Sequence, residues 1–387
     1  MNYFKAVKQL ENYVRLAGVK PGLARIKRLL SLLGNPQKEL KAVHIAGTNG
    51  KGSATLLTTN ALRECGYKVG AYLSPHLAEY TERFLLNGAE ISRRDFAKTF
   101  FAVNREARRV QGITEFEILT AMAFVFFQQQ KIDIAVLETG LGGRYDATNI
   151  CEPVLTIITP IDYDHENILG PGLKKIAAEK AGIIKKGIPL ATVRQAPEAM
   201  SVIRREAAQN KSPLSVISGA DNKRLVAAAL RFLKLPPQKV LRGLRKTVIP
   251  GRVQKWRDNP PFYLDVAHNP QAVRNLLQMA SPQILVFGLM RRKNLEKIME
   301  VLRPKIKLLI AVTLPGSRES EAFTSAEIAA SARECGIPAL IKPNIVSAVR
   351  YAAREAKRLK VTAAAAGSFY LVGEIFKRYK LSRNITD

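Results

Sequence analysis

Short hydrophobic runs alternate with longer amphipathic stretches along most of the chain. Each run is rich in β-branched residues and is followed by about ten or more residues whose hydrophobic positions recur with helical spacing. A parallel β-sheet covered by helices on both faces produces this pattern, because its strands are buried throughout. The predicted strands of the first series are KAVHIAG (41–47), KVGAYLS (68–74), IDIAVLET (132–139), VLTIITP (154–160) and IPLATV (188–193).

A second series of the same kind begins after Pro250 and Gly251. The segment that precedes it, LPPQKVLRGLRKTVIPG (235–251), carries the prolines and charges expected of a hinge. We therefore predict two α/β domains, at residues 1–249 and 250–387. The predicted strands of the second series are FYLDVA (262–267), QILVFGL (283–289), KLLIAVTL (307–314), PALIKP (338–343) and VTAAAAGS (361–368).

The composition adds a strong positive charge to this picture. The chain has 61 Lys and Arg against 32 Asp and Glu, a formal net charge of +29. Such a charge suits a polyanionic partner such as nucleic acid, ATP or a polyacidic substrate. The basic residues are scattered along predicted helices, and no nucleic-acid-binding signature accompanies them. We therefore expect a solvated basic surface and no nucleic-acid partner.

The hydrophobic runs and the cysteines bear on the compartment. No run of 18 or more apolar residues occurs, and MNYFKAVKQLENYVRLAG (1–18) has the spacing of an amphipathic helix rather than of a signal peptide. We therefore expect a cytoplasmic protein without a membrane partner. Separately, we expect a monomer. The three cysteines, Cys65, Cys151 and Cys335, are far apart in apolar surroundings, which favours small core residues over a zinc site or a disulfide framework.

Glycines and one lysine separate the first predicted strand from the helix that follows it. Glycines let backbone N–H groups converge on phosphate oxygens, and the helix N-terminus adds its positive end. Lys51 supplies a charge, and Ser53 can offer its hydroxyl to Mg²⁺. The loop is two residues shorter between its glycines than a Walker loop and has Gly52 between lysine and serine, so a glycine-rich tight turn is the alternative. The predicted nucleotide-binding residues are Gly47, Thr48, Asn49, Gly50, Lys51, Gly52 and Ser53.

Acidic residues follow two other predicted strands. Glu138 ends a buried strand, and a carboxylate beside the phosphate loop is well placed to hold Mg²⁺, although it could also cap a turn. Asp162, Asp164 and His165 follow the next strand. The histidine is either a ligand for a second divalent ion or a hydrogen-bonded turn residue. We favour the ligand because Glu138 and Ser53 should lie nearby.

Several motifs occur together in an order and approximate spacing that resembles the folylpolyglutamate synthase/dihydrofolate synthase family of the Mur-ligase superfamily. The resemblance covers most of residues 40–295, with a weaker similarity near the C-terminus. Its most specific part is the combination of GTNGKGS, SPHL, DATN and AHNP. The motifs are GTNGKGS (47–53), YLSPHLAEYTERFLLNG (72–88), TEFEILTAMAF (114–124), ETGLGGRYDATN (138–149), DHENILG (164–170), AAEKAGIIKKG (177–187), IPGRVQ (249–254), LDVAHNP (264–270) and GSFYLVGE (367–374).

The resemblance implies a fold and a reaction. The first domain is a P-loop parallel-sheet ATPase domain, which binds ATP. The second is a smaller Rossmann-like α/β domain, which is the glutamate-ligase domain. The reaction is the ATP-dependent joining of L-glutamate to dihydropteroate or to folylpolyglutamate through an acyl phosphate. Such chemistry needs positive charge around the transferring phosphoryl group rather than a covalent protein nucleophile. No Ser/His/Asp or Cys/His constellation stands out in the sequence.

The resemblance also assigns residues to phosphate and metal. It implies that Lys51 contacts the β- and γ-phosphates and that Ser53 and Glu138 hold a first Mg²⁺. His165 would help to hold a second ion. Lys180 matches a lysine that the family carbamylates, and a carbamate presents an anionic oxygen where a free ammonium cannot bind a metal. The local sequence alone favours an exposed helix lysine at this position.

The remaining implied site residues come from both predicted domains. The nucleotide contacts from the second domain are Arg252, Asp265 and His268. The positions similar to the family's pterin site are Arg83, Phe116 and Asp146. An aromatic ring there would stack on the pterin and an acid would accept its N–H bonds. Phe116 could instead be a core residue.

The chain departs from the family pattern just before residue 221. Relatives have a long segment there, whereas Ser218, Gly219 and Ala220 alone separate SPLSVI from the next predicted helix. Relatives also begin that helix with His-Gln and have an asparagine near the nucleotide. The corresponding residues here are Asp221, Asn222 and Leu225. The departure implies lower selectivity for adenine or a different supporting residue.

Other functions stay open on the sequence. A related Mur-type amide ligase would act on another carboxylate. A P-loop phosphotransferase would need only GTNGKGS and Glu138 and would leave SPHL and AHNP unexplained. A nucleic-acid-binding protein would use the charge but would not need acids at strand ends. Phosphate release that depends on both glutamate and a folate separates the ligase from the last two.

Overall fold

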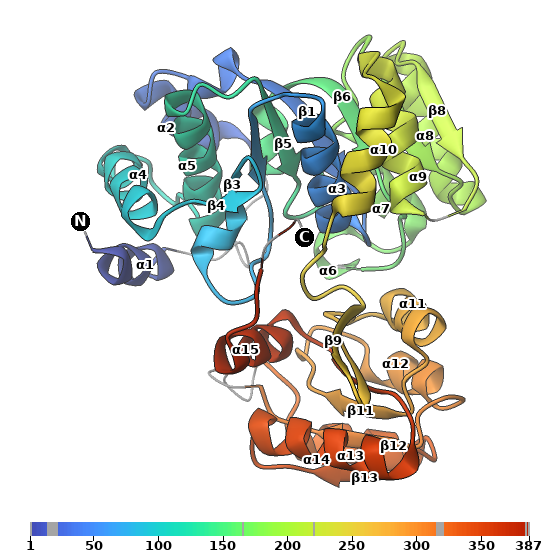
Figure 1. Ribbon diagram of the computed structural model, residues 1–387. Coiled ribbons are helices and arrows are strands. Elements are labelled where there is room, and N and C mark those ends of the chain that lie inside the picture. Colours follow the sequence, from blue (N-terminus) through green and yellow to red (C-terminus); the bar gives the residue numbers. More distant parts are fainter. Residues whose placement is uncertain are drawn as a thin grey trace. The chain divides into compact units, whose positions relative to one another are not determined.

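The computed structural model describes residues 2–13, 22–164, 166–219, 221–314, 321–383 and 385. Its contacts divide the chain into two compact units, and each unit consists of more than one stretch of sequence. The first unit comprises Met1–Pro75, Tyr80–Val248 and Asn384–Asp387, and the second comprises His76–Glu79 and Ile249–Arg383. Each unit is a sheet with helices packed against it (Figure 1).

The described part of the first unit is built on an eight-stranded sheet. Its strands are β1 (Lys41–Ala46), β2 (Val69–Tyr72), β3 (Phe84–Leu86), β4 (Ala89–Glu90), β5 (Ile134–Glu138), β6 (Glu152–Ile158), β7 (Leu190–Val193) and β8 (Leu214–Ile217). They lie in the order β4-β3-β2-β5-β1-β6-β7-β8. The six strands β2, β5, β1, β6, β7 and β8 are parallel to one another. The antiparallel strands β3 and β4 extend one edge. The carboxyl ends of the parallel strands therefore meet at one edge of the sheet, where the sequence places the phosphate loop.

Helices cover both faces of this sheet. They are α1 (Tyr3–Glu11), α2 (Ala24–Leu32), α3 (Lys51–Glu64), α4 (Arg93–Ala107), α5 (Glu115–Gln129), α6 (Glu166–Leu169), α7 (Leu173–Ala181), α8 (Pro197–Gln209), α9 (Asn222–Leu230) and α10 (Pro237–Lys246). Helices α1, α2, α4 and α5 share a hydrophobic cluster with Tyr72, Ala135 and Leu137 of the strands. Helix α3 packs against β1, β2 and β5 and against α9 and α10. Figure 1 shows α5 and α3 on opposite sides of the strands.

The second unit has a smaller sheet with the same architecture. Its strands are β9 (Gln254–Asp258), β10 (Pro261–Leu264), β11 (Ile284–Phe287), β12 (Leu308–Ala311), β13 (Ala339–Ile341) and β14 (Ala363–Ala366). They lie in the order β13-β12-β11-β14-β10-β9, and only β9 among these strands is antiparallel to its neighbour. The helices are α11 (Pro270–Ala280), α12 (Leu295–Leu302), α13 (Ser325–Glu334), α14 (Ile345–Leu359) and α15 (Phe369–Tyr379).

Alternate residues of the second sheet face different helices. In β11, Leu285 and Phe287 pack with α11, α12 and α13, whereas Ile284 and Val286 pack with α14 and α15. Strand β14 consists of four alanines, all buried. Both faces of the sheet are therefore covered, which explains why its strands are continuous hydrophobic runs rather than alternating patterns.

The predicted α/β class is confirmed. Every predicted run overlaps a strand, and most strands end before the last residues of the run because those residues turn toward the following helix. The run 361–368, for example, contains the strand Ala363–Ala366. The hydrophobic alternation did not predict the antiparallel strands β3, β4 and β9.

Two short segments bring distant parts of the chain into these units. In the first unit, the carbonyl oxygen of Ile385 accepts hydrogen bonds from Asn60 Nδ2 at 2.8 Å and from the backbone N–H of Val248 at 2.9 Å. In the second unit, a Cβ atom at Gly373 would lie 1.8 Å from the carbonyl oxygen of Leu77. Helix α15 therefore approaches residues 76–79 as closely as only glycine permits.

The three cysteines differ in how deeply they are buried. Cys151 is buried, as a core residue should be, whereas Cys65 and Cys335 are half-buried. The core interpretation therefore holds for Cys151 and overstates the burial of the other two. Within the described residues, no helix has both the length and the hydrophobicity that a membrane span requires.

Candidate nucleotide-binding and active site

The loop between β1 and α3 needs glycine at two positions. Gly47 has a φ of +147°, and a Cβ atom there would lie 1.9 Å from Thr159 Oγ1. Gly50 is the N-cap of α3 with a φ of +86°, and a Cβ atom there would lie 2.6 Å from Asn222 Nδ2. Both the backbone conformation and the close neighbours exclude a side chain. The glycines therefore let the backbone run close to its neighbours and turn directly into the helix.

Hydrogen bonds hold this loop against the segment that follows β6. The N–H groups of Thr48 and Asn49 donate to the carbonyl oxygen of Pro160 at 2.9 Å and 3.2 Å. Thr48 Oγ1 also donates to the carbonyl oxygen of Asp162 and accepts from its N–H, both at 3.0 Å. The structure thus brings the phosphate loop and the predicted acidic segment together. His165, the predicted ligand in that segment, lies outside the described residues.

Lys51 and Ser53 belong to the first turn of α3. Lys51 is half-buried, and its Nζ lies 3.5 Å from the carbonyl oxygen of Thr48, so its side chain folds back along the loop. Ser53 is buried. The unpaired N–H groups of a helix N-terminus and a nearby ammonium form a site for an anion such as phosphate.

Glu138 lies beside the same turn of α3. Its carboxylate is buried at the end of β5 and accepts a hydrogen bond from the N–H of Ser74 at 3.1 Å. A Cβ atom at Gly52 would lie 3.5 Å from Glu138 Oε2, an ordinary van der Waals distance. The structure therefore places this carboxylate next to the residue that precedes Ser53, as a shared Mg²⁺ ligand pair requires.

Lys180 is a buried residue of α7, contrary to what its local sequence favours. Its Nζ donates to the carbonyl oxygen of Gly47 at 2.8 Å, so the amine lies against the start of the phosphate loop. Burial, followed by the positive charge of Lys51, lowers the pKa of Lys180 to about 7. The nearby Asp164 opposes this effect. Near neutral pH the amine is therefore uncharged for much of the time.

Asp146 organises the loop between β5 and the 3₁₀ helix Ala147–Ile150. Its Oδ2 accepts from the N–H groups of Gly140 and Leu141, both at 2.9 Å. Its Oδ1 accepts from the N–H and Oγ1 of Thr148 at 3.0 Å and 2.6 Å. Burial raises the pKa of Asp146, and these hydrogen bonds oppose the rise. Because four donors already contact this carboxylate, a ligand N–H would have to share or replace one of them.

Phe116 and Arg83 lie near this loop. Phe116 is half-buried at the start of α5, and a Cβ atom at Gly140 would lie 2.5 Å from its ring. Arg83 lies at the end of the 3₁₀ helix Tyr80–Arg83, with its guanidinium 5.4 Å from the centre of the Tyr80 ring. Both Arg83 and Asp146 act electrostatically on Tyr72, whose ring lies 6.1 Å from that of Phe116. The structure thus gathers Arg83, Phe116 and Asp146 in one region of the first unit.

Asp265, Arg252 and His268 come together in the second unit. Asp265 follows β10 and accepts from the N–H groups of Val253 and Ala267, both at 2.6 Å. Burial raises the pKa of Asp265, and the positive charge of Arg252 opposes the rise. Arg252 lies 5.0 Å from the Phe369 ring centre, and the His268 ring lies 6.0 Å from it.

The tautomer of His268 follows from its backbone partner. His268 Nδ1 is 2.8 Å from the carbonyl oxygen of Val266, which can only accept a hydrogen bond. Nδ1 therefore carries the proton, and in the neutral ring Nε2 is the acceptor.

Sequence reasoning missed two contacts of the phosphate loop. Thr159 lies next to Gly47, and the pairing of β1 with β6 could have indicated this, since Ala46 pairs with Ile158. Asn222 Nδ2 lies 3.5 Å from the carbonyl oxygen of Gly50, while Asn222 Oδ1 is buried without a hydrogen-bond partner. Asn222 is therefore the residue of α9 that touches the loop, at a position where the chain departs from the family pattern.

No three His, Cys, Asp or Glu side chains gather as a ready metal site in the part of the chain that the structure describes. The predicted set differs from such a group, since it combines Ser53 and Glu138 with ATP oxygens, a modified Lys180 and His165. Ser53 and Glu138 are both buried beside the first turn of α3, and a hydroxyl and a carboxylate are suitable Mg²⁺ ligands. These two residues fit a metal that is held jointly with phosphate.

Buried His44 gives a pH-dependent prediction. Its Nε2 lies 2.8 Å from Thr148 Oγ1, and Nδ1 is buried without a partner. Burial, followed by the charge of Lys185, lowers the pKa of His44 to about 3. Unfolded His44 takes up a proton near pH 6.5, whereas folded His44 excludes it until about pH 3. The free energy of unfolding should therefore fall by about 1.4 kcal/mol for each unit by which the pH is lowered between about 6.5 and about 3. Urea unfolding at several pH values should show a shallower decline for His44→Gln; parallel declines would contradict the prediction.

Comparison with known proteins connects this arrangement to characterised enzymes. The family described as "Mur ligase, glutamate ligase domain" matches residues 251–368. The dihydrofolate synthase/folylpolyglutamate synthase of Bacillus subtilis is 38% identical over 313 residues, which cover 67% of this chain and 72% of that protein. The folylpolyglutamate synthase of Lacticaseibacillus casei is 30% identical over 372 residues, covering 82% and 86%.

Solved structures give the same result over nearly the whole chain. Mycobacterium tuberculosis folylpolyglutamate synthase, complexed with ADP and AMPPCP, superposes with a TM-score of 0.89 at 26% identity and covers 98% of this chain and 100% of that one. Escherichia coli FolC in complex with DHPP and ADP gives 0.88 at 27% identity, with 98% of each chain covered.

A phosphate loop at the edge of a parallel sheet, joined to a second α/β unit that matches a glutamate ligase domain, defines a Mur-type ligase. The motifs and the similarity over most of both chains are more specific than the fold. The chain belongs to the folylpolyglutamate synthase/dihydrofolate synthase family. The resemblance inferred from the sequence motifs is confirmed.

Proposed function

We propose that the protein uses ATP to join the amine of L-glutamate to the carboxylate of dihydropteroate, of folylpolyglutamate, or of both. Transfer of the γ-phosphoryl group to the carboxylate gives an acyl phosphate and ADP. The glutamate amine then attacks the acyl carbon, phosphate leaves, and the amine loses a proton as the amide forms. The observation that carries this proposal is the gathering of Lys51, Lys180 and Glu138 around the glycine loop.

The loop residues 47–53 supply the ATP phosphates with backbone N–H groups, the N-terminus of α3 and the Lys51 ammonium. Groups that the fold holds in place stabilise charge that develops on the transferring phosphoryl group. Arg252, Asp265 and His268 of the second unit are proposed as further nucleotide contacts. The altered adenine contact stays a prediction, and Asn222 is the residue that supports it.

Two Mg²⁺ ions complete the proposed site. Ser53 and Glu138 would hold the first, while His165 and Lys180 would help to hold the second. Bound Mg²⁺ neutralises charge on the phosphate oxygens. A related enzyme from Yersinia pestis has been solved in complex with AMPPNP and a Mn ion, which supports a divalent metal in this family.

Lys180 is proposed to act as a carbamate. The neutral amine adds to CO₂, a C–N bond forms, and one proton leaves to solvent, so that the product is an anion. The lowered pKa of Lys180 supports this step because it supplies the neutral amine near pH 7. A carbamate oxygen at this place would lie beside the phosphate loop, where Lys180 already contacts Gly47.

The pterin site is proposed around Arg83, Phe116 and Asp146 of the first unit. The half-buried ring of Phe116 packs against the core, and its remaining exposed part is proposed to stack on the pterin. Asp146 would accept pterin N–H bonds by exchanging one of its loop hydrogen bonds.

The proposed domain roles follow the sequence boundaries. Residues 1–249 would form the Mur-ligase-like ATP-binding domain and residues 250–387 the glutamate-ligase domain, supported by the family match over 251–368. We further propose that the protein is a cytoplasmic monomer. Light scattering of the purified protein would test the monomer.

The decisive experiment is incubation of the protein with ATP, Mg²⁺, labelled glutamate and a panel of pteroates and folates. We expect phosphate release that requires both glutamate and a pteroate or folate, together with label in the product. Formation of ADP and a stable phosphorylated acceptor without glutamate would instead support a phosphotransferase. Incorporation only with an unrelated carboxylic acid would identify a different amide ligase.

Nucleic-acid binding is the other function that the charge of +29 invites. The basic residues are scattered along the chain, and no nucleic-acid-binding signature accompanies them. We therefore expect no submicromolar binding to DNA or RNA at physiological salt in a fluorescence anisotropy titration. Tight binding with a steep dependence on salt concentration would contradict this expectation.

A further inference from the structure

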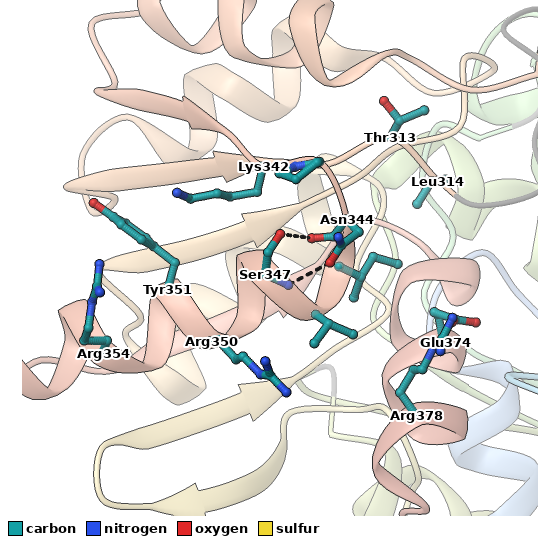
Figure 2. A pocket seen from close by; sticks show the side chains of 13 residues that line it. Thr313, Leu314, Lys342, Asn344, Ser347, Arg350, Tyr351, Arg354, Glu374 and Arg378 are labelled. Atoms are coloured by element: carbon teal, nitrogen blue, oxygen red, sulfur yellow. Dashed lines mark hydrogen bonds and ion pairs between the residues drawn. The ribbon is translucent and has the colours of Figure 1, made fainter.

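The second unit contains a cavity of about 1010 Å³ that none of the proposed site residues lines. Its walls come from the residues that follow β12 and β13, from the first turns of α14 and from α15 (Figure 2). This volume is large enough for a ligand of ordinary cofactor size. The cavity begins at the carboxyl ends of β12 and β13, the same edge of the sheet at which Asp265 follows β10.

The side chains that line this cavity carry an excess of positive charge. The cations are Lys342, Arg350, Arg354 and Arg378, and the acid among the lining residues is Glu374. Glu374 is paired with Arg378 at 2.7 Å. Arg350 forms no ion pair with any described residue. Lys342, Arg350 and Arg354 are therefore not paired with any acidic residue that lines the cavity.

The ring of Tyr351 contacts two of these cations. Lys342 Nζ lies 4.1 Å from the centre of the Tyr351 ring, and the Arg354 guanidinium lies 5.2 Å from it. Arg354 also lies 3.8 Å from Glu355, which does not line the cavity. Contacts with an aromatic ring orient a cation without neutralising it, so both charges stay available to an anion.

Two hydrogen bonds hold the turn at the start of α14. Asn344 Oδ1 accepts from the N–H of Ser347 at 2.9 Å, and Ser347 Oγ donates to the carbonyl oxygen of Asn344 at 2.8 Å. Figure 2 shows both bonds in the centre of the cavity wall. These bonds fix the turn around which the cations of the cavity are arranged.

The arrangement of the cations indicates the kind of anion. Arg350 and Arg354 are one helical turn apart, about 6 Å along α14. Figure 2 shows Lys342 and Arg354 at one side of the cavity and Arg378 at the other. A single compact anion would engage only some of these cations, whereas a chain with a carboxylate on each unit can meet them in succession. Arginine also pairs with carboxylates through two parallel hydrogen bonds.

We propose that this cavity binds an oligocarboxylate chain, namely the γ-linked glutamyl tail of a folylpolyglutamate. The inference rests on the proposed function, since that reaction lengthens such a tail. Inner glutamyl units held here would make long-tailed substrates bind more tightly, while the terminal carboxylate of the same tail is the group that reacts. The cavity would therefore affect KM for folates with several glutamates and leave kcat unchanged.

Direct binding tests the cavity without relying on activity. Isothermal titration of the full-length protein with tetra-γ-glutamate, a tail without a pterin, should show saturable binding that weakens as salt is added. The double variant Arg350→Gln, Arg354→Gln should raise Kd by about tenfold, the effect of losing two partly exposed charge contacts. Inorganic phosphate and monomeric glutamate at equal concentration should compete poorly.

Arg358→Gln is the matched control for charge. Arg358 lies one turn beyond Arg354 on the same helix, is paired with Glu355 at 2.8 Å and does not line the cavity. This variant should leave Kd unchanged. An equal effect of Arg358→Gln would show that diffuse charge binds the tail and would overturn the proposal, as would equally strong competition by phosphate.

Kinetics separate this inference from the proposed function. The double variant should raise KM about tenfold for a tetraglutamyl folate and leave kcat, and both constants for a monoglutamyl folate, unchanged. Ligase activity without tetra-γ-glutamate binding would remove the cavity site and keep the proposed function. Arg350-dependent binding without ligase activity would do the reverse. Thermal unfolding confirms that both variants fold.

Discussion

Replacement of Lys51 by alanine should lower the rate of ATP-dependent ligation by about 10²–10³-fold, equivalent to ~3–4 kcal/mol of transition-state stabilisation. Lys51 begins α3, and the hydrogen-bond partner of its ammonium is the Thr48 carbonyl oxygen at 3.5 Å. Its loss should therefore cost little folding stability, while phosphate loses a positioned charge. Steady-state phosphate release and thermal unfolding of the same preparation measure the two effects separately.

Lys98→Ala provides the matched control for Lys51→Ala. Lys98 is an exposed lysine of α4 in the same unit, so its replacement removes the same charge away from the phosphate loop. We expect unchanged activity in this variant. Near-normal turnover in a folded Lys51→Ala protein would refute the phosphate-loop assignment.

Lys180→Ala should impair catalysis by about 10²-fold, the scale of losing one preorganised electrostatic group, and should affect folding far less. The physical reason is the loss of an anionic carbamate oxygen beside the phosphate loop. Lys180→Arg should fail to restore activity, because arginine keeps the positive charge and forms no carbamate. Short carboxylic acids added to Lys180→Ala should restore part of the rate by occupying the vacated ligand position.

The pH dependence of this modification has a definite sign. The pKa of Lys180 is lowered to about 7, so the fraction of Lys180 that carries a neutral amine rises as the pH rises through 7. The fraction that is carbamylated should rise with it. Carbon-13 NMR with labelled bicarbonate would show the carbamate signal rising with pH. Lys174→Ala, which removes an exposed lysine of the same helix, should keep both signal and activity.

Two results would contradict the role of Lys180. One is full activity of Lys180→Arg. The other is an ATP·Mg²⁺ complex in which the lysine is unmodified and points to solvent. Either result would remove the lysine from the second metal site and would leave the assignments of Lys51, Ser53 and Glu138 unaffected.

The sequence predicted the strands and the phosphate loop because both are local properties. Continuous hydrophobic runs indicate buried parallel strands, and glycines at 47 and 50 are required by positive φ angles and close neighbours. The site residues at strand ends follow from the same topology. The added strands β3, β4 and β9 are short edge elements, whose patterns are too brief to distinguish from loops.

The burial of Lys180 could not be predicted from its own helix. In LKKIAAEKA the lysines at 174 and 175 are exposed while the lysine at 180 is buried, and the difference arises from the contact of α7 with the phosphate loop. The motif resemblance pointed to Lys180 where hydrophobic spacing did not.

The cationic cavity could not be predicted from the sequence, for a different reason. Its residues come from a strand end and from two separate helices, and each cation resembles an ordinary surface charge in its own segment. Only the packing of α14 and α15 brings these cations together. Asn222 beside Gly50 is a similar case, since neither residue is near the other in sequence.

The division of the chain into non-contiguous units limits how the protein can be dissected. A fragment that ends at Val248 would lack Ile385, whose carbonyl oxygen is the partner of Asn60 and Val248. A fragment that begins at Ile249 would lack Leu77, the residue against which α15 packs at Gly373. Each separately expressed half would therefore lack a contact that the other half supplies. Deleting the few residues after 383 would disturb the first unit, although those residues follow the second unit in the sequence.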